Sequence, residues 1–363
     1  MTKLVFTVTN DLNADQRMQR ICGTLQANGY DVTLIGRSSK KSSGLTKQAF
    51  EQKRLFCIFE TGPLFYIEYN FRLFFRLLIL RADAVCAIDL DTVLPVYFAS
   101  VFRQNKRVYD AHEYFTQMKE IVTRPRIQKI WLAIERFAVP RFPRGYTVNH
   151  TIADIFLEKY KVHYGVVYNF AKLDTTTMSS ENGDFILYQG AVNEGREFET
   201  LIPAMQYVQM PLHIYGSGNF VEPLKTLIAA NNVENKVKYF GKVTPAELKR
   251  VTPSAYMGIL LMDRHSLNNY CSLANRFTDY MMAGIPQICV DYPEYRKLND
   301  QYGFADLVDE LTPENLAAHI NTLVRDKEYH ALLRANAIKA RPHLCWEQQE
   351  KNLLDFYQNN IQA

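Results

Sequence analysis

The chain has 363 residues, of which 47% are hydrophobic and 22% are charged. This length suits two domains, and the composition is that of a globular protein, which excludes a fibrous or disordered chain. The six cysteines form neither a Cys-x-x-Cys pair nor a zinc spacing, so we expect a reducing, cytoplasmic setting. We expect no signal peptide, because an apolar strand follows Met1 almost at once.

The net charge of +4 conceals an asymmetry between the two halves of the chain. Residues 1–170 contain 24 Lys and Arg against 15 Asp and Glu, whereas the remainder contains 18 against 23. A basic first half favours an anionic partner, such as a lipid phosphate, an anionic membrane face or an acidic glycan. A solvated basic surface is the alternative. We expect no nucleic acid, because the basic residues are scattered and no nucleic-acid motif accompanies them.

Strands and helices alternate through the first half. Residues 4–8 predict a strand, a helix is expected from the cap Asn13 to Gly29, and residues 31–35 complete a βαβ unit. Further short strands are expected at 84–88, 107–109 and 146–148. This order predicts a doubly wound α/β domain with a parallel sheet.

The most apolar stretch of the chain is residues 64–80. Charged side chains recur in it every four residues, at Glu68, Arg72 and Arg76, and share one helical face. A bilayer-spanning helix needs about 20 nearly uncharged residues. We therefore expect an amphipathic helix that packs on the sheet, with contact to a membrane surface as the alternative.

Polar residues follow two predicted strands of the first half, where side chains of an open sheet face a ligand crevice. His112, in the segment Asp110–Glu113, can bond a sugar hydroxyl or phosphate oxygen and can share a proton near neutral pH. A structural histidine is the alternative. Asp89 lies close to Asp91 in sequence, a pairing seen in metal sites and acid–base pairs, although Asp89 can equally cap a helix.

A second series of strands follows a predicted linker. The linker is expected at residues 172–184, which are small and polar. The expected strands are 185–188, 212–215, 237–240, 257–261 and 287–290. Two successive parallel α/β units joined in this way predict a ligand cleft between the two domains.

The segment Asn269–Pro286 is the most informative part of the second half. It reads as a small-residue loop, a short helix, and then Gly284 and Pro286 before a buried strand. Free N–H groups at a helix start bind anions. Asp279, one turn inside the helix, can accept hydrogen bonds from sugar hydroxyls. The segment predicts a phosphate beside a polyol, as in a nucleotide sugar, and an ordinary β-loop-α unit is the alternative.

The same segment resembles the donor-binding motif of the retaining GT-B glycosyltransferases of family 4, the glycosyl transferases group 1. That motif has two acidic residues separated by seven others, followed by Gly-x-Pro. Asp279 takes the second acidic position and Gly284-Ile-Pro286 the Gly-x-Pro, but Cys271 stands at the first acidic position. The resemblance implies donor contacts from Cys271, Ser272, Leu273, Ala274, Asn275, Arg276 and Asp279.

Other segments resemble the family in the same order along the chain. Arg196 matches the place of a diphosphate-clamping Lys, whereas Ala191 stands where the family has an Arg. Gly216-Ser-Gly218 is similar to the family's Gly-x-Gly, which implies contacts to the nucleotide from Gly216 and Gly218. Phe240-Gly-Lys-Val243 is similar to its Phe-x-Gly-x-Val turn, which implies backbone contacts to the base from Lys242 and Val243.

In the first half, the segment Asp110–Glu113 resembles the family's Asp-x-His-Glu, which implies catalytic roles for His112 and Glu113. Most of the family has glycines after the first strand, and this chain has none there. We expect Asn10 and Arg17 to take their place on the acceptor side, and Asp89, which follows a predicted strand, to face the same crevice.

The resemblance implies an α/β protein of the GT-B fold, with two Rossmann-like doubly wound parallel-sheet domains facing a central cleft. We expect an N-terminal domain at 1–170, a donor-binding domain at 171–345, and a final helix at 346–363 that rejoins the first domain. The implied activity is retaining, metal-independent and cofactor-free transfer of a sugar from a UDP- or GDP-linked donor. The implied acceptor is a glycan or lipid-linked molecule, and the enzyme is expected in the cytoplasm or at the inner face of the membrane.

Two alternatives stay open. Cys271 and Ala191 are consistent with a catalytically weakened nucleotide-sugar-binding protein. The fold is also compatible with a sugar-nucleotide epimerase or a phosphorylase, because a fold does not decide a reaction.

Overall fold

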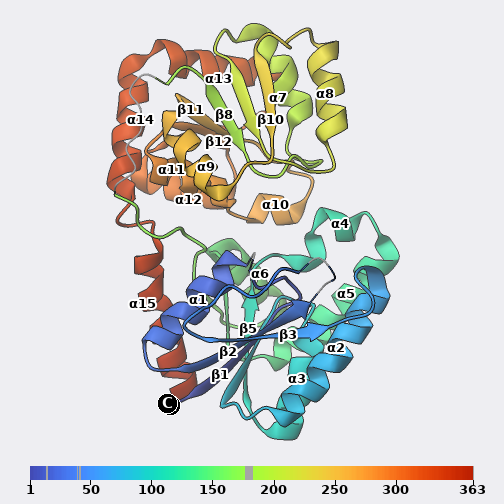
Figure 1. Ribbon diagram of the computed structural model, residues 1–363. Helices are drawn as coiled ribbons and strands as arrows, with labels where there is room; N and C mark the ends of the chain where they lie inside the picture. The colour runs from blue at the N-terminus through green and yellow to red at the C-terminus, as the bar shows by residue number, and fades with distance from the viewer. Residues whose placement is uncertain (14, 39, 41, 176–182, 363) are drawn as a thin grey trace. The chain divides into compact units, whose positions relative to one another are not determined.

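The computed structural model describes residues 1–13, 15–38, 40, 42–175 and 183–362. The chain forms two compact units, unit 1 with Met1–Asn169 and Gln349–Ala363, and unit 2 with Phe170–Gln348. Each unit is an α/β structure built on a parallel sheet (Figure 1), so the predicted fold class is confirmed. Most of the predicted linker, residues 176–182, lies outside the described residues.

Unit 1 contains a seven-stranded parallel sheet in the order β3-β2-β1-β4-β5-β6-β7. The strands are β1 Lys3–Thr7, β2 Asp31–Ser38, β3 Glu51–Phe56, β4 Ala84–Ile88, β5 Lys106–Ala111, β6 Gly145–Thr147 and β7 Gly165–Val166. Strand β1 pairs with both β2 and β4, with Leu4 opposite Val32 and Ala84. The chain order therefore reverses between β1 and β4, and open α/β sheets bind ligands at the carboxyl ends of the strands at such a point.

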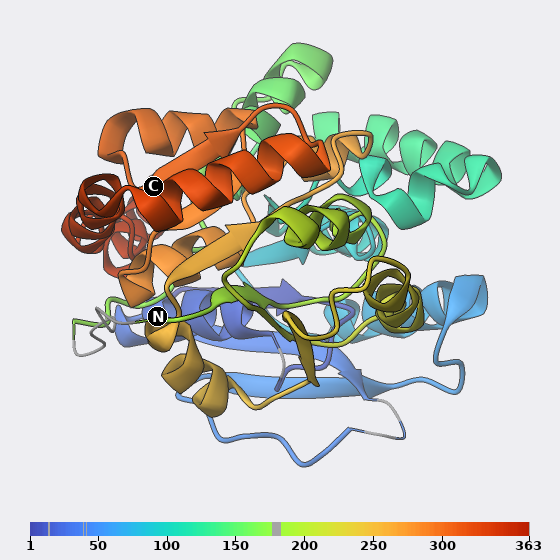
Figure 2. The ribbon, with the colours of Figure 1, turned by 90° about the horizontal axis from the view of Figure 1, so that it is seen from above.

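Helices cover both faces of this sheet. They are α1 Gln16–Ala27, α2 Gly62–Ile79, α3 Val93–Arg103, α4 Lys119–Val122, α5 Pro125–Ala138 and α6 His150–Tyr160. Helices α2, α3 and α5 lie on one side of the sheet and α1 on the other (Figure 1), and α2 lies on the outside of unit 1 in both views (Figures 1 and 2). The predicted cap at Asn13 is wrong, because the carboxylate of Asp15 accepts the hydrogen bond from the Met18 N–H.

The end of the chain belongs to unit 1. Helix α15, Trp346–Tyr357, brings Glu350 to α1, where its carboxylate accepts a hydrogen bond of 2.7 Å from the Thr24 hydroxyl. The Tyr357 ring packs against the ring of Phe6 in β1, with 6.0 Å between the ring centroids. Both Phe6 and Tyr357 are fully buried, so the C-terminal helix contributes to the core of the first unit.

Unit 2 contains a six-stranded parallel sheet in the order β10-β9-β8-β11-β12-β13. The strands are β8 Ile186–Gln189, β9 Leu212–Tyr215, β10 Val237–Gly241, β11 Met257–Leu260, β12 Gln287–Val290 and β13 Ala305–Val308. The helices are α7 Phe198–Ala204, α8 Val221–Ala230, α9 Pro245–Val251, α10 Leu267–Cys271, α11 Asn275–Ala283, α12 Pro293–Tyr302, α13 Pro313–Arg325 and α14 Lys327–Ala340. Here the order reverses between β8 and β11, so α11, which follows β11, begins beside the switch point.

Helix α11 ends where the sequence predicts. Gly284 follows Ala283 with a φ of 73°, a left-handed conformation that favours glycine, and its N–H caps the last turn. None of the described helices combines the length and the apolar character needed to cross a bilayer.

Candidate active site

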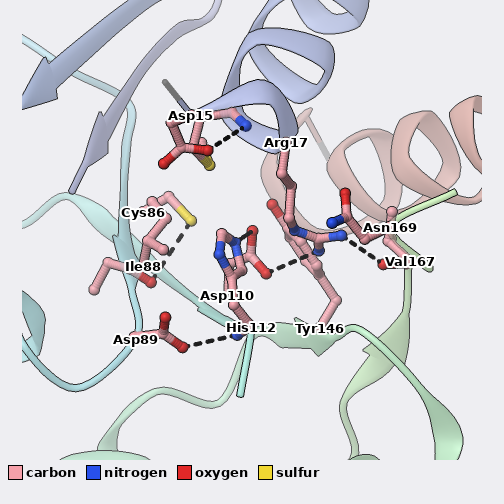
Figure 3. Close-up of polar contacts among 12 residues, drawn as sticks. Asp15, Arg17, Cys86, Ile88, Asp89, Asp110, His112, Tyr146, Val167 and Asn169 are labelled. Atoms are coloured by element: carbon pink, nitrogen blue, oxygen red, sulfur yellow. Dashed lines mark hydrogen bonds and ion pairs between the residues drawn. The ribbon is translucent and has the colours of Figure 1, made fainter. Parts of the chain in front are cut away.

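A buried ion pair ties α1 to the end of β5 in unit 1 (Figure 3). Asp110, the penultimate residue of β5, is fully buried, and its Oδ1 lies 3.1 Å from Nη2 of Arg17. Arg17 Nη1 also donates to the carbonyl of Val167 at 3.0 Å. The other oxygen of Asp110, Oδ2, lies 3.0 Å from Nε2 of His112. One carboxylate therefore holds both an arginine and the predicted catalytic histidine.

Neighbouring charges shift the pKa values of both His112 and Asp110. Burial opposes protonation of His112, but the negative charge and hydrogen bond of Asp110, together with the charge of Asp89, outweigh it and raise the pKa of the imidazole. Burial alone would raise the pKa of Asp110, but the positive charges of Arg17 and His112 hold it below its ordinary value. Since Nε2 is engaged, Nδ1 is the ring nitrogen of His112 that has no hydrogen-bond partner among the described residues.

Asp89 bridges the end of β4 to the segment after β5. Its Oδ1 accepts hydrogen bonds from the backbone N–H groups of His112, at 2.8 Å, and Glu113, at 3.4 Å. Burial raises the pKa of Asp89 to about 8, although the nearby charge of His112 opposes this. Asp89 has a φ of 53°, in the left-handed region, so a strained backbone places this carboxyl under the histidine.

Asp91 completes the polar group at the switch point. Its carboxylate accepts a hydrogen bond from the hydroxyl of Thr9, which follows β1. Burial raises the pKa of Asp91 to about 6, and this hydrogen bond opposes the rise. Within the described ranges, no three His, Cys, Asp or Glu side chains are grouped so that they could hold a metal ion.

The structure thus brings together four of the five residues predicted for the first unit. His112 and Arg17 meet at Asp110, and Asp89 holds the backbone of His112 and Glu113. Arg17 is 5% exposed, so it holds the aspartate inside unit 1 instead of presenting its guanidinium to an acceptor. Asn10 lies apart from this group and donates to the carboxylate of Asp15 at the start of α1.

In unit 2, glycines allow three loops to meet at the carboxyl ends of β8, β9 and β10. The Gly190 N–H donates to the carbonyl of Tyr215, and the Gly216 N–H donates to the carbonyl of Gly241. A Cβ atom on Gly216 would lie 1.7 Å from the Gly190 carbonyl oxygen, and one on Gly218 would lie 2.1 Å from that of Val192. The predicted Gly216-Ser-Gly218 segment is therefore needed for close packing of loops.

Lys242 and Val243 follow Gly241 directly and extend this rim. Lys242 is exposed and Val243 is partly exposed. Both residues therefore lie at the carboxyl edge of the sheet, where the resemblance places contacts to a base.

A buried cation lies at the start of α11. The guanidinium carbon of Arg276 lies 4.6 Å from the centroid of the Tyr188 ring, and a Cβ on Gly190 would touch the Arg276 side chain at 3.3 Å. Arg276 is 8% exposed, and its Nη1 has no hydrogen-bond partner among the described residues. An arginine held by an aromatic ring, without a carboxylate to neutralise it, keeps its charge for an anion.

Tyr295 lies near both this cation and the predicted clamp Arg196, and its hydroxyl has a backbone partner at the start of α11. This hydroxyl accepts a hydrogen bond of 2.9 Å from the Ala274 N–H. Burial raises the pKa of Tyr295, and the positive charges of Arg276 and Arg196 both oppose the rise, so both arginines act on the same hydroxyl. The Ala274 amide is thus already engaged, and the amides of Asn275 and Arg276 are the ones that begin the helix.

The remaining residues of the donor segment differ in exposure. Ser272 and Leu273 are partly exposed between α10 and α11, Asn275 is exposed, and Asp279 is partly exposed one turn into α11. Cys271 is only 2% exposed, and burial and the charge of Glu294 raise its pKa to about 11. The thiol that stands at the first acidic position is therefore neutral and packs inside unit 2.

Comparison with known proteins agrees with this description. Residues 172–340 match the model of the family described as glycosyl transferases group 1, so unit 2 is a domain of that family and the predicted family is confirmed at this level. No curated protein sequence matches the chain.

Solved structures resemble the whole chain. Sucrose-phosphate synthase (tll1590) from Thermosynechococcus elongatus has a TM-score of 0.77 at 14% identity, covering 99% of both chains. Anabaena Alr3699/HepE in complex with UDP-glucose has a TM-score of 0.76 at 13% identity, covering 99% of this chain and 100% of that one. WaaG, a glycosyltransferase involved in lipopolysaccharide biosynthesis, has a TM-score of 0.72 at 15% identity, covering 97% and 98%. These likenesses confirm the GT-B fold.

Proposed function

We propose that this group 1 glycosyltransferase moves a sugar from a UDP- or GDP-linked donor to a glycan or lipid-linked acceptor, with retention at the anomeric carbon and without a metal ion. The observation that carries the proposal is that Arg196, between β8 and α7, and Arg276, in the first turn of α11, both lie close enough to Tyr295 to affect it electrostatically. Arg276 lies over the ring of Tyr188, and none of the described carboxylates forms an ion pair with it. The similar HepE structure contains UDP-glucose, which supports a nucleotide-sugar donor.

The donor site would stabilise the charge that develops on the leaving group. Cleavage of the anomeric C–O bond leaves negative charge on the diphosphate and oxocarbenium character on the sugar. Arg196, Arg276 and the first amides of α11 offer fixed positive charge for that diphosphate. In a water-poor site, loss of one such donor typically lowers kcat by about 100- to 1,000-fold. Asp279 supplies the carboxylate for the ribose hydroxyls.

On the acceptor side, His112 would bind the substrate. Asp110 fixes the ring through Nε2, so Nδ1 is oriented for a sugar hydroxyl or a phosphate oxygen. The raised pKa of His112 favours the imidazolium, which binds a phosphate oxygen more strongly than a neutral ring does. We place the reaction in the cytoplasm, where the six buried cysteines keep their free thiols.

The proposal is tested by incubating the protein with a panel of UDP- and GDP-sugars, with and without EDTA, and following both melting temperature and donor breakdown. A sugar nucleotide that binds the folded state raises the melting temperature. We expect one donor to do so and to be hydrolysed slowly without acceptor, equally well with EDTA. Binding without hydrolysis or transfer would identify a binding protein, as the buried Cys271 allows. Interconversion of the donor sugar would identify an epimerase.

A further inference from the structure

The outer side of α2 carries a row of exposed apolar side chains. Ile67, Phe71, Phe75 and Ile79 recur every four residues along this side of the helix. Ile67 is 66% exposed, Phe71 is 64% exposed and Ile79 is 74% exposed. The opposite side of α2 packs into unit 1, so the helix is apolar on both faces. Water-facing helix surfaces in globular proteins are normally polar.

The row continues onto the neighbouring helix. Helices α2 and α3 pack against each other, and both lie on the same side of unit 1 (Figure 1). Phe74 of α2 contacts Phe102 of α3, with 6.1 Å between ring centroids. Phe98 and Phe102 are also exposed, the latter by 71%. We name Ile67, Phe71, Phe75, Ile79, Phe98 and Phe102 the α2–α3 patch. Single exposed apolar residues are ordinary, but a continuous patch indicates an interaction site.

Helices α2 and α3 carry more basic than acidic side chains. Helix α2 contains two arginines and a single acid, Glu68. The Glu68 carboxylate is engaged by Arg72 at 2.8 Å and by the backbone N–H groups of Ile58 and Phe59. Helix α3 ends in Arg103 and contains no acid. Arg81, just after α2, is also exposed.

We propose that the α2–α3 patch docks unit 1 on an anionic lipid surface. Phenylalanine and isoleucine side chains enter the boundary between head groups and acyl chains, while exposed arginines at the helix ends bind lipid phosphates. A second copy of the chain is the competing occupant. A symmetric contact would bring identical arginine-rich surfaces together, and the single acid on these helices is already engaged. This inference goes beyond the proposed function, because lipid binding requires neither donor nor transfer.

Co-sedimentation with phospholipid vesicles tests the inference. The full chain should bind vesicles of phosphatidylcholine mixed with phosphatidylglycerol, bind pure phosphatidylcholine more weakly, and lose affinity as salt is raised. The double variant Ile67→Gln/Phe71→Gln should lower the partition coefficient by about 100-fold, since two apolar side chains no longer leave water. Arg81→Gln/Arg103→Gln should lower it by about 30-fold, on mixed vesicles only.

The matched control is Leu332→Gln in α14 of unit 2, where Leu332 is 55% exposed and lies outside the patch. It should bind as the wild type does. Should the α2 double variant melt at a lower temperature than the wild type, Phe102→Gln alone replaces it. Wild-type protein that does not bind the mixed vesicles would overturn the inference. So would a wild-type dimer, seen by light scattering, that Ile67→Gln/Phe71→Gln converts to a monomer.

Donor binding separates the two proposals. The patch variants should keep the melting-temperature shift produced by the donor sugar nucleotide, because none of these residues lies at the carboxyl ends of the strands. Vesicle binding with no donor shift would overturn the proposed function alone. A donor shift with no vesicle binding would overturn the lipid inference alone.

Discussion

Nε2 of His112 lies 3.0 Å from Oδ2 of Asp110, and the other oxygen of the same carboxylate is held by Arg17. The histidine that the sequence predicts as a catalytic candidate is therefore oriented by a buried ion pair. This relationship connects the stability of unit 1 to the protonation of its candidate acceptor site. We therefore expect substitutions here to change both the stability of the protein and the way that stability depends on pH.

Asp110→Asn should destabilise the protein by about 3 kcal/mol, because it leaves the buried Arg17 without its partner charge. The pKa of His112 should fall below its ordinary value in the same variant, because burial and the charge of Arg17 then act on it without the opposing charge of Asp110. Urea denaturation measures the first effect and NMR titration of His112 the second. Asp154→Asn, at an exposed position of α6, is the control and should change neither. An unchanged His112 pKa would show that the two side chains are not coupled.

His112 and Asp110 should make the free energy of unfolding depend on pH in a defined way. Folding raises the pKa of His112, so its protonation stabilises the folded state. This stabilisation is fully present below the unfolded pKa of about 6.5 and is lost as pH rises through the folded pKa. Folding lowers the pKa of Asp110, so its ionised form stabilises the folded state. This stabilisation is fully present above the unfolded pKa of about 3.9 and is lost as pH falls through the folded pKa. The difference in unfolding free energy between wild type and His112→Gln should be largest between these values. A difference that stays constant from acid to alkaline pH would contradict the assignment.

Asp89→Asn should stabilise the protein near neutral pH. The pKa of Asp89 is raised to about 8, so the folded state binds a proton that the unfolded state has released, and stability falls as pH rises from about 4 to 8. Asparagine tolerates the φ of 53° and keeps the oxygen that accepts from His112 and Glu113. We expect a gain of about 1 kcal/mol at neutral pH, discounted because Asp89 is partly exposed, and none at about pH 4.

Unfolding by urea at both pH values measures this gain. A variant that is less stable than the wild type at neutral pH would show that Asp89 is ionised there and stabilises the folded state. An equal gain at both pH values would assign the effect to something other than proton binding.

Tyr188→Phe and Tyr188→Leu form a matched pair at the proposed donor site. The hydroxyl of Tyr188 donates to the carbonyl of Ala191 at 2.7 Å, and its ring lies under Arg276. The phenylalanine variant keeps the ring, so it should lose about 1 kcal/mol of stability with little change in donor affinity. The leucine variant lacks the ring and should bind the donor about tenfold more weakly. Equal donor affinity in both variants, measured by calorimetry, would show that the ring does not position Arg276.

Strands with strong apolar runs between turn residues could be predicted from the sequence. The strands at 84–88, 212–215 and 287–290 agree with the structure at both ends. Strand β3 could not be found in this way, because Glu51–Phe56 is an edge strand with a polar sequence and no alternation of buried apolar residues. Gly284 and Pro286 predict the end of α11, which the structure confirms at Ala283.

Roles that depend on distant partners could not be predicted. Arg17 and Asp110 are 93 residues apart in sequence, so their ion pair has no local signal. The Ala274 amide is bound by Tyr295, 21 residues away, and Cys271 is buried although its place in the motif implies contact with a ligand. The spacing Asp110-Ala-His112 was a usable signal, since residues two apart on a strand point to the same side.

The central claim is that the start of α11 in unit 2 binds a sugar nucleotide, and isothermal titration calorimetry with UDP- and GDP-sugars tests it most directly. We predict that one of these donors binds the wild type, and that Asp279→Ala weakens binding by about 10- to 100-fold because the ribose loses a carboxylate acceptor. Asp300→Ala, at an exposed position of α12, should bind as the wild type does. No heat with any of these donors, or an Asp279→Ala variant that binds as tightly as the wild type, would contradict the claim.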